Sequence, residues 1–533
     1  MRSQYRRSRA LGPVIGGIAL VLLSASAAFA NSIQYAESEA ESSTTSTSYQ
    51  TKTTLTFTPS VAGDYLIFAS AEFKGNLDSR SIYARLRQDS TTTLGQMSAE
   101  PEETDIYIQH FITHRIVTLS AASHTFTIEY ATENAALTAY VRRARIVAIP
   151  LETYSSAETP GPTSVSSTSY TTIATTTFTP GSAQNYLLIA TAEFDVNSTT
   201  ESISVRADID GTDLGTLWSE AQDTSDLLSY ASVSVRSLTA ASHTFRIQAR
   251  DEATNHSIQN TRVTAIPLDD NLFSTQSAAT EAYTTNNSST YADITTLNFT
   301  PSEAGTYYMF TSAILGGEST NGSTYNALAD FDNNGTEDNL LQKGFQDDTD
   351  RMSFGSIRQK SLAASSQTFK LRVREGGASS PDAGLGSARI IALSEDFNIS
   401  GTVYTNEGTT NIGSGKTVSI AVDGVLKTSL DTDSNGSFKV RVPDAATAGS
   451  IITVWIDDET ENGVTVTETD GNEIVIDVYQ NRLIVRHDNA GSLTNNDLDT
   501  ANNTGDSDIS AIYTLDVSDN LTMASSTELF VWT

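Results

Sequence analysis

One stretch decides the fold: residues 57–73 read FTPSVAGDYLIFASAEF. The stretch occurs three times, and the tyrosine that begins its apolar run recurs every 121 residues, at Tyr65, Tyr186 and Tyr307. The units of solenoid proteins are roughly 20–50 residues long, so a period of this size is that of a whole domain. The chain is therefore expected to contain three similar domains in a row.

The stretch has the pattern of a turn followed by a buried β-strand. Pro59 cannot donate to a strand ladder and closes the strand before it, and Gly63 suits the turn. Alternate residues from 65 to 73 are apolar on one face of the run, and Leu66 and Phe68 are apolar on the other. This pattern is typical of a central strand that is covered on both sides.

The three repeats are expected to span 31–152, 153–270 and 271–396. Each contains short alternating apolar runs separated by turn residues and shows no helical periodicity. This predicts an all-β chain of tandem antiparallel β-sandwiches, most simply jelly rolls. Because the linkers between the repeats are short, we expect an extended and fairly stiff array.

The order of signals within each repeat resembles that of a known family. A Phe-x-Pro turn is followed by a Tyr-led central strand and then, in the first two copies, by a late His-Thr-Phe strand at His124 and His243. This order resembles the C1q/TNF-like jelly-roll modules of bacterial surface proteins over about 31–395. The resemblance implies the same sandwich fold.

The sequence changes character at Phe397. A Ser-Gly-x-Val strand begins at Ser400, and a Thr-Asp-x-x-Gly-x-Phe hairpin follows at 432–438. Both features resemble the carboxypeptidase regulatory-like family over 397–480, which implies a smaller Ig-like or prealbumin-like sandwich with a noncatalytic, adhesion-associated role. Residues 481–533 are a β-rich tail, either a truncated further module or a segment whose last strand closes the small sheet.

The first 30 residues have the three parts of a signal peptide. Four arginines precede an apolar run, and the small-x-small motif that ends at Ala30 predicts cleavage before Asn31. We expect an extracellular or cell-surface protein. An uncleaved anchor is the alternative, although the run is shorter than the roughly 18 residues that a span needs. No other stretch is long and apolar enough, so no membrane span is expected in the mature chain.

The composition limits the partners. The chain carries a net charge of −32, and loss of the four signal arginines leaves −36. Nucleic-acid binding needs basic patches that displace counterions, so we predict no nucleic-acid partner. The chain has no cysteine. No disulfide can therefore stabilise it after export, and each domain must rely on its own core.

Asp330, Asp332 and Asn334 resemble the start of a calcium loop, with oxygen ligands at the first, third and fifth positions and glycine at the sixth. The twelfth position holds leucine instead of glutamate, so a plain hairpin turn is the alternative. The hairpins at Asp208 and Asp431 allow the same two interpretations. No other cofactor is predicted, and we do not expect folding to require metal.

The histidines are expected to have structural roles. His110 and His114 share a strand face, where four residues span about 13 Å, too far for both to bind one zinc ion. His124 and His243 recur at one turn, but the third repeat has Gln367 there. We therefore interpret this position as a turn residue.

Glu72 and Glu193 recur between the first two repeats, and paired carboxylates can hydrolyse glycosidic bonds. The third repeat has Ile314 at this position, and no second carboxylate recurs with them. We expect these glutamates to pair with a strand arginine such as Arg145 or Arg262. No catalytic residue is predicted.

The expected function is that of a secreted or cell-surface binding and spacer protein without catalytic activity. Its tandem modules would adhere to an unknown extracellular ligand, a glycan or another surface protein, and repetition would add avidity. The sequence leaves two alternatives open: a structural surface-layer or stalk component, and a glycan-active hydrolase.

Overall fold

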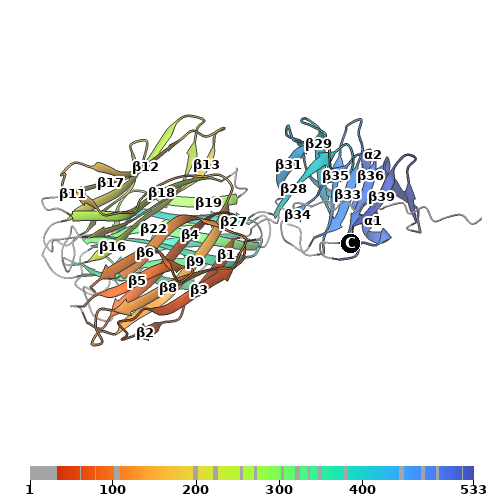
Figure 1. The fold of residues 1–533 in the computed structure, drawn as a ribbon. Coiled ribbons are helices and arrows are strands. Elements are labelled where there is room, and N and C mark those ends of the chain that lie inside the picture. Colours follow the sequence, from red (N-terminus) through yellow and green to blue (C-terminus); the bar gives the residue numbers. More distant parts are fainter. Residues whose placement is uncertain are drawn as a thin grey trace, which may run out of the picture.

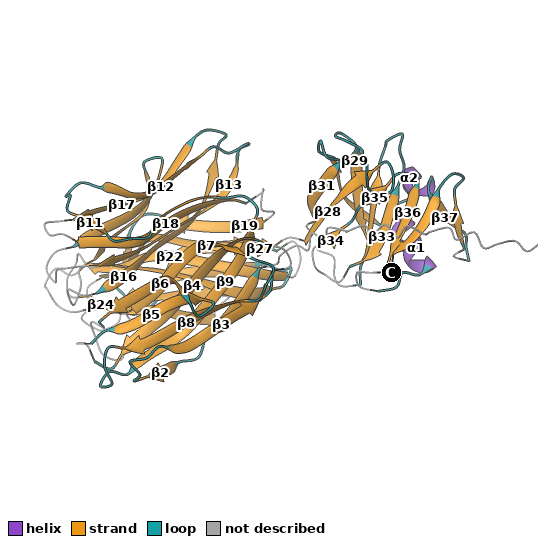
Figure 2. Ribbon diagram, in the orientation of Figure 1, coloured by secondary structure: helices purple, strands orange, loops and turns teal. Residues whose placement is uncertain are grey.

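A computed structural model describes residues 33–532, apart from 60–61, 78–79, 101–108, 196–201, 220–225, 252–255, 269–272, 302–304, 319–324, 334–335, 346–350, 376–381, 396, 443–448, 470–473, 488–490 and 519. The expected cleavage site at Ala30 and Asn31 lies outside this part of the chain. Nearly all of the regular secondary structure in the described residues is β-strand, with the three repeats together and a smaller unit after residue 397 (Figure 1, Figure 2). The prediction of an all-β chain of antiparallel sandwiches is confirmed.

The first repeat is a sandwich of two antiparallel sheets. Its inner sheet contains, in order, β1 (Gln34–Ser38), β9 (Ala139–Leu151), β4 (Gly63–Gly75) and β7 (Gln109–Leu119), with β2 (Ser42–Thr44) also paired to β9. Its outer sheet contains, in order, β3 (Gln50–Phe57), β8 (His124–Thr132), β5 (Ile82–Gln88) and β6 (Thr92–Ala99). Two such sheets, connected by chain that crosses between them, form a jelly roll.

The second repeat has the same order of strands. Its inner sheet contains β10 (Ser155–Thr159), β18 (His256–Pro267), β13 (Gln184–Asp195) and β16 (Leu227–Leu238), with β11 (Thr163–Val165) paired to β18. Its outer sheet contains β12 (Thr171–Phe178), β17 (His243–Asp251), β14 (Ile203–Ile209) and β15 (Thr212–Ser219).

The third repeat follows the same plan. Its inner sheet contains β19 (Phe273–Thr280), β27 (Asp382–Glu395), β22 (Gly305–Glu318) and β25 (Arg351–Leu362), with β20 (Thr284–Asn286) paired to β27. Its outer sheet contains β21 (Ala292–Phe299), β26 (Gln367–Glu375), β23 (Tyr325–Asn333) and β24 (Thr336–Phe345).

The repeated stretch forms the central strand of each inner sheet. In β4, Tyr65, Ile67 and Phe73 are buried in the core of the first jelly roll, whereas Leu66 and Phe68 belong to a second apolar cluster. The predicted cover on both sides of this strand is therefore confirmed. The other two repeats provide the second cover.

The inner sheets of the three repeats pack against one another. Phe68 and Phe310 meet edge to face, with ring centroids 5.3 Å apart. The shared cluster contains equivalent pairs from the three central strands: Leu66 and Phe68, Leu187 and Ile189, Tyr308 and Phe310. The expected extended array is therefore wrong for the repeats, which lie side by side (Figure 1). Each inner sheet is apolar on both faces, and mutual packing removes the second face from water.

The unit after residue 397 is a second type of sandwich. One sheet contains β31 (Ser437–Val442), β28 (Phe397–Tyr404) and β34 (Ile474–Val475), with β35 (Val478–Tyr479) also paired to β28. The other contains, in order, β30 (Val425–Asp431), β29 (Thr417–Val422), β32 (Ile451–Ile456), β33 (Val464–Glu468), β36 (Arg482–Arg486) and β39 (Glu528–Trp532).

The tail is part of this second sandwich. Strands β36 and β39 extend the larger sheet through parallel pairing, so the last strand of the tail forms an edge of this sheet. The sheet's outer face packs Trp455 against elements of the tail. These elements are α1 (Asn495–Asn502), α2 (Ser507–Ser510), β37 (Tyr513–Leu515) and β38 (Leu521–Met523).

Across the described ranges, none of the helices combines the length and apolar character needed to cross a membrane.

Candidate functional site

Three buried arginines join the repeats to one another. They hold equivalent positions in β9, β18 and β27, and each pairs with a glutamate of its own repeat: Arg145 with Glu39, Arg262 with Glu158 and Arg389 with Glu281. Each also donates from Nη1 to a hydroxyl of a neighbouring repeat: Arg145 to Ser356 (2.6 Å), Arg262 to Thr113 (3.1 Å) and Arg389 to Ser232 (3.2 Å). The donations run from the first repeat to the third, from the second to the first and from the third to the second. They form a closed ring around the shared cluster.

A β-bulge lies beside each of these arginines. Arg143, Asn260 and Ser387 have φ angles of 48°, 46° and 47°, in a region that residues other than glycine rarely adopt. The strand register shifts at the same three places, as expected for a bulge. The neighbouring residue of the central strand is Glu72 in the first repeat, Glu193 in the second and Ile314 in the third.

In the first two repeats, polar side chains fill the space at the bulge. Arg142 donates from Nε to Glu72 at 2.7 Å, and Arg143 lies 3.2 Å from the same carboxylate. Asn260 donates to Glu193 at 2.7 Å, and the backbone N–H of Gln96, from the first repeat, donates to it at 2.8 Å. Glu193 therefore joins the second repeat to the first, and Glu72 is held by donors of its own repeat.

In the third repeat the same position opens into a cleft. Ile314 replaces the glutamate, and Gly386 and Ser387 replace its donors. The small residues leave a cleft of about 420 Å³ between the second and third repeats. It is lined by Asp213 and Thr216 of the second repeat and by Glu281, Ala282, Tyr283, Ile314, Arg351, Gly386 and Ser387 of the third. A volume of this size is within the range of ligand pockets, about 300–1,000 Å³.

Two glycines fix the aromatic wall of the cleft. A Cβ atom at Gly384 would lie 2.6 Å from the ring of Tyr283, and one at Gly386 would lie 3.0 Å from it. The ring therefore lies directly on the backbone of β27, where only glycine allows so close an approach. The guanidinium of Arg351 lies over the same ring, 4.4 Å from its centroid.

The two acids of the cleft are already hydrogen-bonded within the protein. Asp213 accepts from the backbone N–H of Gly215 at 2.7 Å and from the hydroxyl of Thr216. Glu281 accepts from Arg236 at 2.7 Å and also pairs with the interface arginine, Arg389. The cleft thus offers an aromatic face, an apolar floor at Ile314 and one guanidinium, an arrangement suited to binding a polar ligand with an apolar face.

The recurring glutamates are buried, each in its own repeat. Burial raises the pKa of Glu72 in spite of Arg143 and Arg142, and burial raises the pKa of Glu193 to about 6. The two carboxylates lie in different repeats, and each is held by its own donors. The expected pairing with a strand arginine is confirmed for Glu72, but its partners are Arg142 and Arg143 and not Arg145. For Glu193 the expected partner Arg262 is wrong, because the bulge turns Asn260 toward the carboxylate instead.

The predicted calcium residues that the structure describes, Asp330 and Asp332, lie in a hairpin beside an arginine. Asp330 and Asp332 are buried in β23, and the guanidinium of Arg372 lies 2.5 Å from Asp330 and 3.2 Å from Asp332. A cation there would have to displace Arg372, so the ion pairs favour the hairpin interpretation. Asn334 lies outside the described residues.

The other two predicted hairpins are also held by their own chain. Asp208 accepts from Gly211 at 3.1 Å and pairs with Arg246 at 2.8 Å. Asp431 accepts from the hydroxyl of Thr417 at 3.2 Å.

The histidines take the structural roles expected of them. His124 and His243 contact Asp89 and Asp210 across the predicted turn, at 2.9 and 2.6 Å, and Gln367 donates to backbone carbonyls at its own turn. His114 is buried between the first two repeats, with Nδ1 2.9 Å from the hydroxyl of Thr191 and Nε2 3.0 Å from that of Thr264. The ring of His110 meets Phe354 of the third repeat.

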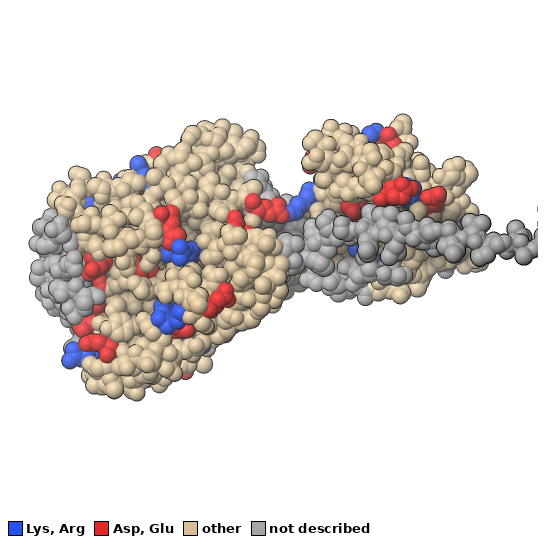
Figure 3. Space-filling model, in the orientation of Figure 1, with Lys and Arg blue, Asp and Glu red and all other residues tan. Residues whose placement is uncertain are grey.

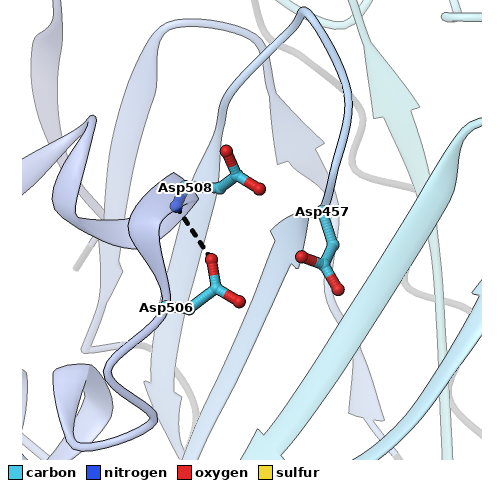
Figure 4. A group of neighbouring side chains, drawn as sticks. All are labelled: Asp457, Asp506 and Asp508. Atoms are coloured by element: carbon cyan, nitrogen blue, oxygen red, sulfur yellow. Dashed lines mark hydrogen bonds between the residues drawn. The ribbon is translucent and has the colours of Figure 1, made fainter.

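Three aspartates come together in the last sandwich. Asp457 follows β32, while Asp506 and Asp508 belong to the start of α2 (Figure 4). One carboxylate oxygen from each lies within 4.8 Å of the others. Asp508 accepts from the N–H of Asp458 at 2.7 Å, and Asp506 caps α2 by accepting from the N–H of Asp508 at 2.8 Å. Carboxylate oxygens are ligands for hard cations, but these hydrogen bonds also explain the grouping.

The cleft could not be found from the sequence, because its walls come from residues that are up to 174 positions apart, Asp213 and Ser387. The only local signal is that Ile314 stands where the first two repeats have glutamate. This difference predicts a cleft only if it is known that the second repeat packs against this position.

Comparisons with known proteins show no family. No family model matches the chain, and no curated protein matches it. Among solved structures, tandem CBM51 modules of a family 98 glycoside hydrolase from Streptococcus pneumoniae match with 10% identity over 44% of this chain and 87% of that one, at a TM-score of 0.14. A triple jelly-roll protein of an archaeal virus turret matches with 10% identity over 64% and 81%, at a TM-score of 0.14.

A third solved structure is the pilus adhesin SpaC of Lactobacillus rhamnosus GG. It matches with 9% identity over 79% of this chain and 56% of that one, at a TM-score of 0.11. At such TM-scores we take neither the arrangement of the repeats nor a ligand from these three proteins.

Proposed function

We propose that this chain is an extracellular, noncatalytic binding protein and that the cleft between the second and third repeats is its ligand site. The observation that carries this proposal is the difference among three equivalent positions. Two are closed by glutamate and its donors, and one is opened by Ile314, Gly386 and Ser387.

The chemistry of the cleft favours a glycan. Sugar rings have apolar C–H faces that suit an aromatic wall, and their hydroxyls suit hydrogen-bonding side chains around it. Tyr283 supplies the ring, and Thr216 and Arg351 supply polar groups. The face drawn in Figure 3 shows charged side chains in small separate groups and no extended basic patch, in keeping with a partner other than nucleic acid.

A glycan screen on residues 31–533 tests the proposal. The substitution Tyr283→Ala should weaken binding at least tenfold, a loss of about 1.4 kcal/mol. Tyr291→Ala is the matched control, because that ring also lies under arginines of the third repeat, 5.0 Å from Arg372, but outside the cleft. It should bind like the unaltered protein.

A hydrolysis assay on the same glycans separates the alternatives. Turnover that disappears in Glu72→Gln or Glu193→Gln would replace the binding function with that of a hydrolase. Self-association without binding to any glycan would instead support a structural role in a surface layer or stalk.

A further inference from the structure

Among the described residues, the cleft contains one cation without an ion-pair partner. This cation is Arg351, the only basic residue among the described residues that line the cleft. Within the described part of the chain, its guanidinium forms no ion pair, and its aromatic contact with Tyr283 is the one interaction it makes. The chain contains 64 acidic and 32 basic residues, so a basic side chain has many possible partners. An arginine that lines a cleft and forms no ion pair with a described residue is available to a ligand.

The neighbouring acids do not take this role. Asp213 accepts hydrogen bonds from Gly215 and Thr216, and Glu281 pairs with Arg236 and Arg389. Among the described residues, neither acid forms an ion pair with Arg351, which lines the same cleft.

The contact with Tyr283 leaves the N–H groups of Arg351 available to a carboxylate. The guanidinium carbon lies over the Tyr283 ring, 4.4 Å from its centroid, and no side-chain N–H group of Arg351 donates to a described residue. The N–H groups at the edge of the plane can then donate in parallel to the two oxygens of one carboxylate, a strong and geometrically specific pair. The apolar floor at Ile314 and the Tyr283 ring suit the C–H face of the sugar that carries this carboxylate.

We propose that the cleft selects an acidic sugar, a carboxylated monosaccharide unit within a glycan, with Arg351 binding the carboxylate and Tyr283 the ring. This inference rests on the proposed function. It adds a stoichiometry of one ligand per chain, because the equivalent positions at Glu72 and Glu193 are filled.

Titration calorimetry on residues 31–533 tests this inference with a panel of hexuronate and sialyl oligosaccharides, each paired with its methyl ester. An ester keeps the sugar and removes the charge. At least one acid should bind tenfold or more tightly than its ester, with one site per chain and weaker binding at higher salt. Arg351→Gln should abolish this preference. Arg374→Gln should keep it, because Arg374 also stacks on a tyrosine of the third repeat, 5.0 Å from the ring of Tyr291, but lies outside the cleft.

The outcomes separate this inference from the function it rests on. If glycans bind in a Tyr283-dependent way but no acid is preferred over its ester, the acidic-sugar inference is wrong and the binding function stands. If Arg351→Gln leaves the preference intact, or if three ligands bind per chain, the inference is also wrong. If no glycan of either kind binds, both proposals fail.

Discussion

Single arginines determine how the repeats meet. Arg262 is buried, pairs with Glu158 at 3.0 Å in its own repeat and donates to Thr113 of the first repeat at 3.1 Å. A buried charge is tolerated only where it is paired and hydrogen-bonded. The ring of three such arginines therefore disfavours any other packing of the repeats, which would leave these charges without partners.

We expect Arg262→Ala to lower the free energy of unfolding by about 2–4 kcal/mol, since it removes a buried ion pair and its cross-repeat hydrogen bond. Arg115→Ala is the control, because Arg115 contacts the same Glu158 at 3.2 Å but its side chain is 29% exposed. This exposed pair should contribute less than about 1 kcal/mol. Chemical denaturation of both variants measures the difference. Equal losses would contradict a special role for the buried arginine.

His114 makes the packing of the repeats sensitive to acid. Burial, assisted by the charge of Arg262, holds the pKa of His114 well below its usual value. The unfolded chain therefore binds a proton that the folded chain does not, and stability falls as the pH drops below about 6.5. The loss from this residue approaches about 1.4 kcal/mol per pH unit.

The equivalent residues of the other repeats, Val233 and Ile357, supply the test. His114→Val should make the unfolding free energy depend less steeply on pH between 7 and 5. The slope should fall by at most the contribution of one bound proton, about 1.4 kcal/mol per pH unit. His124→Gln is the control, because that histidine lies at a turn outside the shared cluster. An unchanged slope in His114→Val would show that other groups, such as His110, whose pKa burial lowers to about 3, dominate the acid response.

At the scale of strands, the sequence is informative about what is local. The alternation in β4 predicts a strand covered on both sides, and the turn residues predict the hairpins, because both depend on near neighbours. What covers the second face of β4 cannot be predicted from near neighbours. That face packs against strands β13 and β22, which are more than one hundred residues away in the sequence. The bulges at Arg143, Asn260 and Ser387 have no common residue type, so sequence alone could not predict that Glu72 pairs with Arg142 and Arg143.

The start of helix α2 carries unfavourable charge. Burial, followed by the charges of Asp457 and Asp508, raises the pKa of Asp506. A raised pKa for an acid means that its ionised form costs stability above that pKa, and that this cost disappears as the pH falls. Asp506→Asn keeps an N-cap of equal quality and should raise the free energy of unfolding at pH 7 by a few tenths to about 1 kcal/mol.

Asp516→Asn is the control, because it should change stability in the opposite direction. Hydrogen bonds from Asn520 and from two backbone N–H groups lower the pKa of Asp516, so its charged form is stabilising and its neutral substitute should lower the melting temperature. Melting of residues 397–533 in chelator measures both. A loss of stability in Asp506→Asn that appears only with added calcium would show instead that the three aspartates hold a cation.

As a whole molecule, the chain contains one triple unit and one smaller sandwich. The three jelly rolls share an apolar cluster, and β16 even joins β6 of the first repeat at Leu227 and Ser98. The last sandwich has two apolar clusters formed from its own residues. Cooperative stability should follow the same division, because a repeat loses its second cover when it is separated from the other two.

The second repeat alone, residues 153–270, should therefore not be a stable monomer. It would expose Leu187, Ile189 and Val233 to water and leave Arg262 without Thr113, and each large apolar side chain loses about 1.5–3 kcal/mol on exposure. We expect sedimentation to show self-association of 153–270 into trimers or larger species, whereas 397–533 should be a monomer that melts cooperatively. A monomeric 153–270 with the melting temperature of 31–396 would mean that each jelly roll is sufficient by itself. Mutual packing of the repeats would then not explain why β4, β13 and β22 are apolar on the face that forms the shared cluster.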